Sequence, residues 1–304
     1  MPAPAPAAIS LPDAYARCTA LAKAHYENFP VGWLMPKAKI HHVHAVYAFA
    51  RHTDDLADEG YASGFDFGGE LPPNPTPEQR LAALDKWEEG LRDPEKGAHE
   101  PFLVALHATI RELGLPLSLF TDLLSAFKQD VTKTRYANHA EILDYCRRSA
   151  NPIGRLVLLL NGFRDEERFL QSDAICTGLQ VANFWQDISV DLLKDRIYLP
   201  QDEMAALGIT VADLQAGRSD PEFRAAFRAL VRNQVGKAWD LFERGRDLSR
   251  TLPIPLKWEI GVTWLGGTTI LRKIEKLDYD TLHTRPKLGK LDLPLLFLRT
   301  LLTF

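Results

Sequence analysis

The chain has 304 residues, 46% hydrophobic and 25% charged, an ordinary globular composition with enough apolar residues for a sizeable core. The formal net charge of −4 lacks the basic excess typical of nucleic-acid-binding proteins, so we exclude nucleic acid as a partner. Cys18, Cys146 and Cys176 form no CxxC pair, which excludes a disulfide framework or a zinc site and indicates core packing in a reducing compartment.

Helical periodicity runs through the chain, and strand-like alternation is almost absent. We therefore predict an all-α fold, with a disordered Pro/Ala-rich leader over 1–10, one domain over 11–290 and an apolar tail over 291–304. Two helix starts pair a cap residue with Pro at the first helical position, at Thr76-Pro77 and Asp220-Pro221. The predicted helices span residues 11–28, 37–59, 77–92, 99–113, 117–132, 139–161, 165–193, 221–249, 255–264 and 267–280.

The predicted helix 37–59 carries a polar stripe that ends in "HTDDLADE". At about 100° per residue, Tyr47, Arg51, Asp54 and Asp58 lie within about 60° of one another, and apolar residues cover the other faces. Acids four residues apart are common by chance, so this pair alone is a weak signal. A Gly/Pro-rich loop, 64–77, follows it and is a candidate lid.

The predicted helix 165–193 repeats the device. Asn183, Asp187 and Asp191 lie within about 60° of Gln180, and apolar residues fill the remaining faces. A surface helix has the opposite proportions, although a solvated run of charges is the alternative interpretation. We expect this helix to be central, with its stripe lining an internal cavity.

Unpaired carboxylates are costly to bury, so two such pairs on apolar helices indicate a positively charged ligand. Mg²⁺ needs only one or two carboxylates per ion and fills its shell with water or phosphate oxygens, which suits a bound diphosphate. Arg51 shortly precedes the first pair, and Arg196 shortly follows the second. Both would neutralise phosphate oxygens. The alternative for each arginine is a structural ion pair with a neighbouring aspartate.

The tail "LDLPLLFLRTLLTF" is apolar but interrupted by Pro294 and Arg299. It is shorter than the roughly 18 apolar residues that a membrane-spanning helix needs. It either packs on the body of the protein or rests on a membrane surface.

Three motifs together resemble the squalene/phytoene synthase family of isoprenoid synthases. They are "YAFARHTDDLADE" (47–59), "YCRRSANPIGRLVLLL" (145–160) and "GLQVANFWQDISVDLLKDRIYLP" (178–200). The likeness runs over about residues 25–280. It implies an isoprenoid synthase fold around an apolar cavity and a prenyl diphosphate substrate.

The resemblance also implies roles for single residues. It makes Asp54, Asp58, Asp187 and Asp191 the Mg²⁺-diphosphate ligands and Arg51 a phosphate contact. The expected walls of the substrate cavity are formed by Tyr145, Ala150, Gly154, Gln180 and Asn183, and Tyr145 is also a candidate catalytic residue. Tyr47, Asn151 and Arg196 are further candidate substrate-binding residues. For Gly154, tight packing between helices is the alternative.

Departures from the family pattern indicate which reaction to expect. Asn151-Pro152, Gln186, Gly267 and the segment 25–31 all differ from commoner relatives, and Pro152 should bend its helix. Together these variants resemble the bacterial hydroxysqualene synthases of hopanoid biosynthesis, which implies presqualene diphosphate and water as substrates, without NADPH. We expect an opening near the variant positions that admits a water, held by some of Asn151, Gln180, Asn183 and Gln186.

Two alternatives stay open: a squalene or phytoene synthase that condenses two prenyl diphosphates head to head, and a non-catalytic helical scaffold. The expected location is cytoplasmic, peripheral at the inner face of the membrane. Peripheral membrane contact and association with other hopanoid-pathway enzymes are the candidate interactions beyond substrate.

Overall fold

The structure is a computed structural model that describes residues 9–24, 39–58, 74–289 and 292–304. Within these ranges the chain is helical, with one isolated bridge between Arg135 and Ile197 and no strand. The predicted all-α class is confirmed. Three predictions lie wholly or largely outside the described residues: the leader, the segment 25–31 and the candidate lid.

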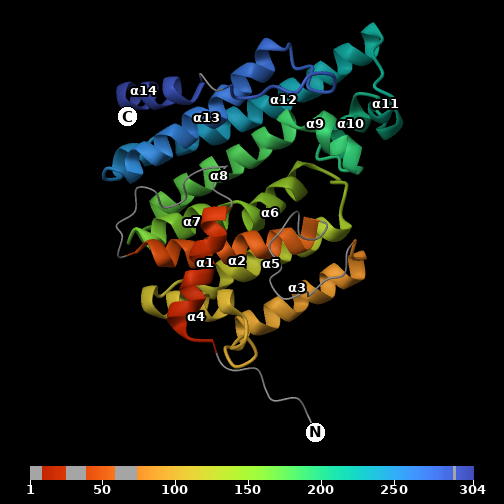
Figure 1. The fold of residues 1–304 in the computed structure, drawn as a ribbon. Coiled ribbons are helices and arrows are strands. Elements are labelled where there is room, and N and C mark those ends of the chain that lie inside the picture. Colours follow the sequence, from red (N-terminus) through yellow and green to blue (C-terminus); the bar gives the residue numbers. More distant parts are fainter. Residues whose placement is uncertain (1–8, 25–38, 59–73, 290–291) are drawn as a thin grey trace. The chain divides into compact units, whose positions relative to one another are not determined.

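Figure 1 shows the described helices, which belong to two compact units. The first unit comprises residues 1–132 and 156–163, and the second comprises 133–155 and 164–304. Helix α7 (Asn151–Leu160) passes from the second unit into the first. Each unit is described separately below.

In the first unit, α2 (Ile40–Asp58) contacts each of the other helices that precede residue 133. Its Phe49 is fully buried and packs against Trp87 and Phe120. The apolar faces of α2 therefore form the centre of this unit. The surrounding helices are α1 (Leu11–Ala24), α3 (Pro77–Arg92), α4 (Pro101–Leu113) and α5 (Leu117–Thr132).

In the second unit, α8 (Glu166–Gln186) contacts α6, α12 and α13. Its Trp185 is fully buried, so α8 is the central helix of this unit. The other elements are α6 (His139–Ser149), α9 (Ile188–Asp191), η1 (Leu192–Lys194), α10 (Gln201–Ala206), α11 (Val211–Gln215), α12 (Pro221–Gly245), η2 (Leu248–Thr251), α13 (Leu256–Lys276) and α14 (Asp292–Thr303). None of the described helices is long and apolar enough to cross a membrane.

Both predicted Pro-marked helix starts are confirmed. The Thr76 hydroxyl accepts from the Gln79 N–H, and the Asp220 carboxylate accepts from the Phe223 N–H. Each cap satisfies one of the N–H groups that the first turn of a helix leaves without a partner.

Four predicted helices have the wrong continuity. The helix 139–161 is interrupted at Ala150, because Pro152 has no N–H to continue the helical hydrogen bonds; the structure has two helices where we expected one bent helix. The helix 165–193 is interrupted at Asp187, which ends α8 with φ −102° and ψ 12°. The two helices predicted at 255–264 and 267–280 are one helix, α13, in which Gly267 packs closely against Phe242 and neither Gly266 nor Gly267 forms a turn.

Candidate active site

The first acidic motif lies on the more accessible side of α2. Tyr47, Arg51 and Asp54 are partly exposed and Asp58 is exposed, whereas the apolar residues of the same helix are buried. The helical period of 3.6 residues places these four side chains along one stripe. This arrangement gives the first unit an accessible acidic strip bordered by one arginine.

Arg51 is engaged within this strip. Its guanidinium binds the Asp55 carboxylate one turn away, at 2.6 Å from Nη2 to Oδ1 and 3.2 Å from Nε to Oδ2. Burial lowers the pKa of Arg51, but the Asp55 hydrogen bond and the charges of Asp55 and Asp54 outweigh it, so the pKa is raised. The structural ion pair left open for Arg51 is therefore present.

The second acidic motif sits at the end of α8, where the helix is interrupted before the short helix α9. Asp187 ends α8, and its carbonyl accepts from the N–H groups of Val190 and Asp191. After η1, Asp195 adopts a left-handed conformation with φ 54°, which Asp tolerates better than most residues. The turn brings the Arg196 N–H to 2.9 Å from the Asp191 carbonyl oxygen. The local backbone thus returns Arg196 to the acidic pair.

Asp187 has a cationic partner that the sequence analysis missed. Arg285 binds it through two hydrogen bonds, 2.6 Å from Nε to Oδ1 and 2.9 Å from Nη2 to Oδ2. The adjacent Gln186 donates from Nε2 to the Pro286 carbonyl at 2.8 Å. The segment after α13 is therefore fastened to the end of α8 at two neighbouring positions. Arg285 is 98 residues from Asp187 in sequence, and no local pattern signals the contact.

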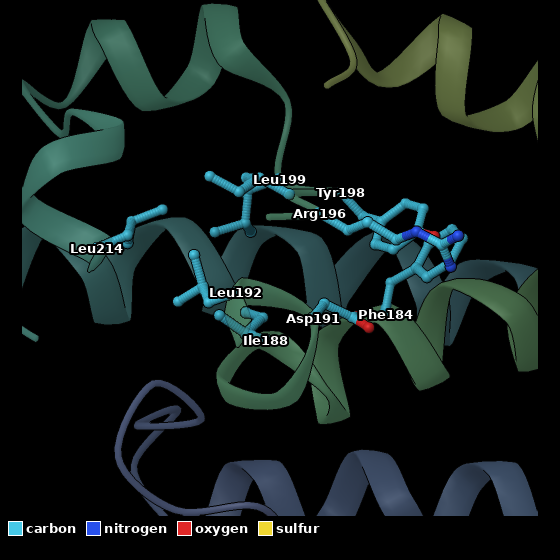
Figure 2. Close-up of a pocket in the computed structure, with 9 residues that line it drawn as sticks. Phe184, Ile188, Asp191, Leu192, Arg196, Tyr198, Leu199 and Leu214 are labelled. Carbon is cyan, nitrogen blue, oxygen red and sulfur yellow. The ribbon is translucent and has the colours of Figure 1, made fainter. Parts of the chain in front are cut away.

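Asp191 lies in a pocket (Figure 2). Burial and the neighbouring charge of Asp187 raise the pKa of Asp191 to about 7, against the lowering effects of Arg196, Lys194 and Arg285. In Figure 2 the polar ends of Asp191 and Arg196 lie near the rings of Phe184 and Tyr198, with leucines on the other side. Ionised Asp191 is therefore unfavourable beside Asp187 in spite of the three neighbouring cations.

Aromatic rings pack beside this pocket. Phe184 stacks on Tyr198 at 3.7 Å between ring centroids. Tyr145, predicted as a wall of the substrate cavity, is buried and has its ring 6.0 Å from that of Phe184 and 5.9 Å from that of Tyr136. The central motif thus reaches the second acidic motif through an aromatic cluster, and Ala150 ends the helix that carries Tyr145.

The four amides proposed to hold water divide into two classes. The Asn151 Oδ1 accepts from the Thr177 hydroxyl at 2.8 Å, and Gln186 holds the segment at Pro286, so both serve structure. Gln180 is partly exposed and Asn183 is exposed, and within the described part of the chain neither side chain has a hydrogen-bond partner. Gln180 and Asn183 therefore remain available to a ligand.

The two glycines singled out in the sequence are closely packed. A Cβ on Gly154 would lie 2.4 Å from Ser172 Oγ and 2.5 Å from Cys176 Sγ on α8. A Cβ on Gly267 would lie 2.4 Å from a ring carbon of Phe242. Tight packing is therefore the role the structure gives Gly154, and the opening expected at Gly267 is wrong, because Phe242 fills that space.

The carboxylates of the second acidic motif suit Mg²⁺ better than a metal ion whose ligands all come from the protein. Across the described ranges, no three His, Cys, Asp or Glu side chains gather into a metal-binding group. The pair of Asp187 and Asp191 offers two carboxylates, and burial with the charge of Asp187 raises the pKa of Asp191, an effect that a bound cation would oppose. Mg²⁺ commonly takes one or two carboxylates and completes its shell with water and phosphate.

Comparisons with known proteins define the class and then the family. The crystal structure of squalene synthase HpnC from Alicyclobacillus acidocaldarius aligns with a TM-score of 0.76 and 38% identity, covering 88% of this chain and 95% of that one. The fold is therefore that of the isoprenoid synthases. The model of the squalene/phytoene synthase family matches residues 21–292. The chain belongs to the squalene/phytoene synthase family.

Two relatives show the range of reactions that this similarity covers. The chain is 33% identical over 270 residues to the hydroxysqualene synthase of Sinorhizobium fredii. This alignment covers 88% of this chain and 85% of the relative. It is 29% identical over 288 residues to the phytoene synthase of Arthrospira platensis, in an alignment that covers 90% of this chain and 87% of that relative.

Proposed function

We propose that this protein is a hydroxysqualene synthase, which converts presqualene diphosphate and water to hydroxysqualene and diphosphate in hopanoid biosynthesis. The observation that carries the proposal is the similarity to a hydroxysqualene synthase over 88% of the chain. The four aspartates of the two acidic motifs are retained, which supports a catalytic protein over a helical scaffold.

The residues would divide the work as follows. Asp54 and Asp58 on α2, and Asp187 and Asp191 after α8, would hold Mg²⁺, which supplies charge stabilisation for the departing diphosphate. Arg196 and Arg285, whose charges act on Asp191, would bind phosphate oxygens. Arginine suits this role because its planar fork matches phosphate geometry.

The reaction balances without a reductant. The C–O bond to diphosphate breaks and its electron pair leaves with the diphosphate, which is stabilised by fixed positive charge. A water oxygen then bonds to the rearranged carbocation and releases one proton. The amides of Gln180 and Asn183 would position this water, since a bound water needs about two to four polar partners.

A squalene synthase reaction is the second candidate. The relative from Alicyclobacillus acidocaldarius is described as a squalene synthase and is 38% identical. Both candidate reactions would use the same two acidic motifs, so the four aspartates do not discriminate between a hydroxysqualene synthase and a squalene synthase.

The test uses the purified protein with Mg²⁺ and presqualene diphosphate in ¹⁸O-labelled water, with and without NADPH. We expect ¹⁸O in the product hydroxyl under both conditions, measured by mass spectrometry. A hydrocarbon product without oxygen, or a strict need for NADPH, would replace this proposal with squalene synthase. A parallel incubation with farnesyl diphosphate shows whether the first condensation is also catalysed.

A further inference from the structure

The outer side of α14 presents a row of leucines. Leu295, Leu298 and Leu302 are 52%, 54% and 80% exposed, and at about 100° per residue they lie within about 60° of one another. Leu301, 46% exposed, widens the row. We call these four residues the leucine face.

The leucine face is exposed although α14 is docked. On the opposite side Leu296 and Thr300 are buried. Thr300 lies so close to Gly261 of α13 that a Cβ there would be 2.7 Å from Thr300 Cγ2. The ring of Phe304 packs edge-on to Trp264 at 5.8 Å. Helix α14 thus lies along α13 (Figure 1). Because its other side packs on α13, the leucine face is left exposed.

One cation borders this face. Arg299 lies about 40° around the helix from Leu295, and its side chain has no ion pair or hydrogen bond with any described residue. The two other arginines near the end of α14 are committed, since Arg246 binds Glu243 and Arg250 binds Asp247. Arg299 is therefore the cation at this edge that remains available to an external anion.

We propose that the leucine face docks on the surface of a phospholipid bilayer, with Arg299 at the level of the lipid phosphates. A helix with an apolar face and a basic edge lies in the membrane interface, and a long arginine reaches outward from apolar surroundings to the headgroups. At about 18 Å, a helix of this length is too short to span the bilayer.

The docking stands independently of the proposed function, because it rests on α14 alone. The two combine favourably, since an isoprenoid substrate and product partition into the same bilayer.

The test is flotation of the full chain with phosphatidylcholine vesicles and with vesicles that also contain phosphatidylglycerol, in the absence of substrate. We compare wild type with the double variant Leu298→Glu/Leu302→Glu. Inserted leucines contribute strongly to partitioning, so the double variant should bind at least about tenfold more weakly to both vesicle types. Arg299→Gln should weaken binding mainly to the anionic vesicles.

The matched control is Leu143→Glu/Leu207→Glu, which adds the same charge at exposed leucines of α6 and at the end of α10. It should float like wild type, and far-UV circular dichroism should show the same helix content in all variants. Equal flotation of wild type and Leu298→Glu/Leu302→Glu would overturn the proposal. So would a wild type that stays off the vesicles and forms a dimer that this double variant abolishes, which would assign the face to a second copy.

Discussion

Asp187 and Asp191 are one turn apart, yet they lie in opposite electrostatic settings. Asp187 is held by both nitrogens of the Arg285 fork. Asp191 is partly buried, and its raised pKa records a carboxylate that is unfavourable beside Asp187. Substitution of the two residues should therefore have different consequences for stability.

Turnover should fall by orders of magnitude in each of Asp54→Asn, Asp58→Asn, Asp187→Asn and Asp191→Asn, because an amide neither carries the charge nor binds Mg²⁺ as a carboxylate does. Helix content should stay unchanged. Rates are measured with saturating Mg²⁺. Near-normal rates in any two of these variants would show that the magnesium assignment is wrong.

Thermal unfolding of the metal-free protein should separate the second pair. The sequence alone suggests that every Asp→Asn change relieves repulsion among carboxylates. The structure predicts a higher Tm for Asp191→Asn and a lower Tm for Asp187→Asn, which leaves Arg285 without its partner. We expect effects on the order of 1 kcal/mol, since both sites are partly solvated. Shifts in the same direction would contradict this account.

Arg285→Gln should also lower the Tm of the metal-free protein by a few degrees, because it loosens the segment after α13 from the end of α8. Lys287→Gln, an exposed cation in the same segment, is the matched control. An equal loss in both variants would assign the effect to general surface charge and not to the ion pair.

At the scale of elements, helix ends and helix contacts decide where functional groups lie. Where one straight helix was predicted, the interruption at Asp187 and the turn at Asp195 bring the Arg196 N–H to the Asp191 carbonyl. At the glycine pair Gly266-Gly267 the opposite holds: a break between two helices was predicted, and the structure has the continuous helix α13. Only one of these two glycines is tightly packed, which makes the pair a useful experiment.

Gly267→Ala should destabilise the protein by about 1–3 kcal/mol, because its Cβ would overlap Phe242 and Leu179 and overpacking strains a core. Gly266→Ala adds a Cβ that meets no atom within 4 Å. It should be neutral or stabilising by up to about 1 kcal/mol, because alanine favours the helix. Urea unfolding measures both. A Gly267→Ala variant as stable as Gly266→Ala would show that the contact with Phe242 is loose.

At the scale of the whole molecule, buried histidines tie stability to pH. In the first unit His42 and His44 are buried, with their Nδ1 atoms 3.0 Å from the hydroxyls of Thr109 and Thr19 respectively. Burial, with the charge of His41, lowers the pKa of His42, and burial with Lys23 lowers that of His44. Both side chains are therefore neutral in the folded protein near pH 7.

Stability should fall as the pH is lowered from about 7 to about 5, because the unfolded chain takes up protons near the ordinary histidine pKa of about 6.5 and the folded chain does so at lower pH. The contribution is present above that value and is lost as the pH falls through the folded pKa values. His42→Gln/His44→Gln should reduce the slope of Tm against pH. His99→Gln, at an exposed position, should keep it, and an unchanged slope in the double variant would exclude these histidines as the cause.

The sequence by itself determined the all-α class, the Pro-marked helix starts and the polar stripe of α2. These features depend on residues within a turn or two of one another, so periodicity and capping chemistry specify them. The family likeness was also readable, because its motifs are contiguous stretches.

Only the tertiary structure decided which groups meet across long separations. Arg285 reaches Asp187 because the chain after α13 folds back on the end of α8, and the two residues share no sequence period. Gly267 is a packing position because Phe242 of α12 fills its empty side, and the leucine face is exposed because α14 uses its other side to bind α13. In each case the outcome depends on which surfaces exclude water from one another, and such contacts are set by packing between helices and not by the order of residues within one.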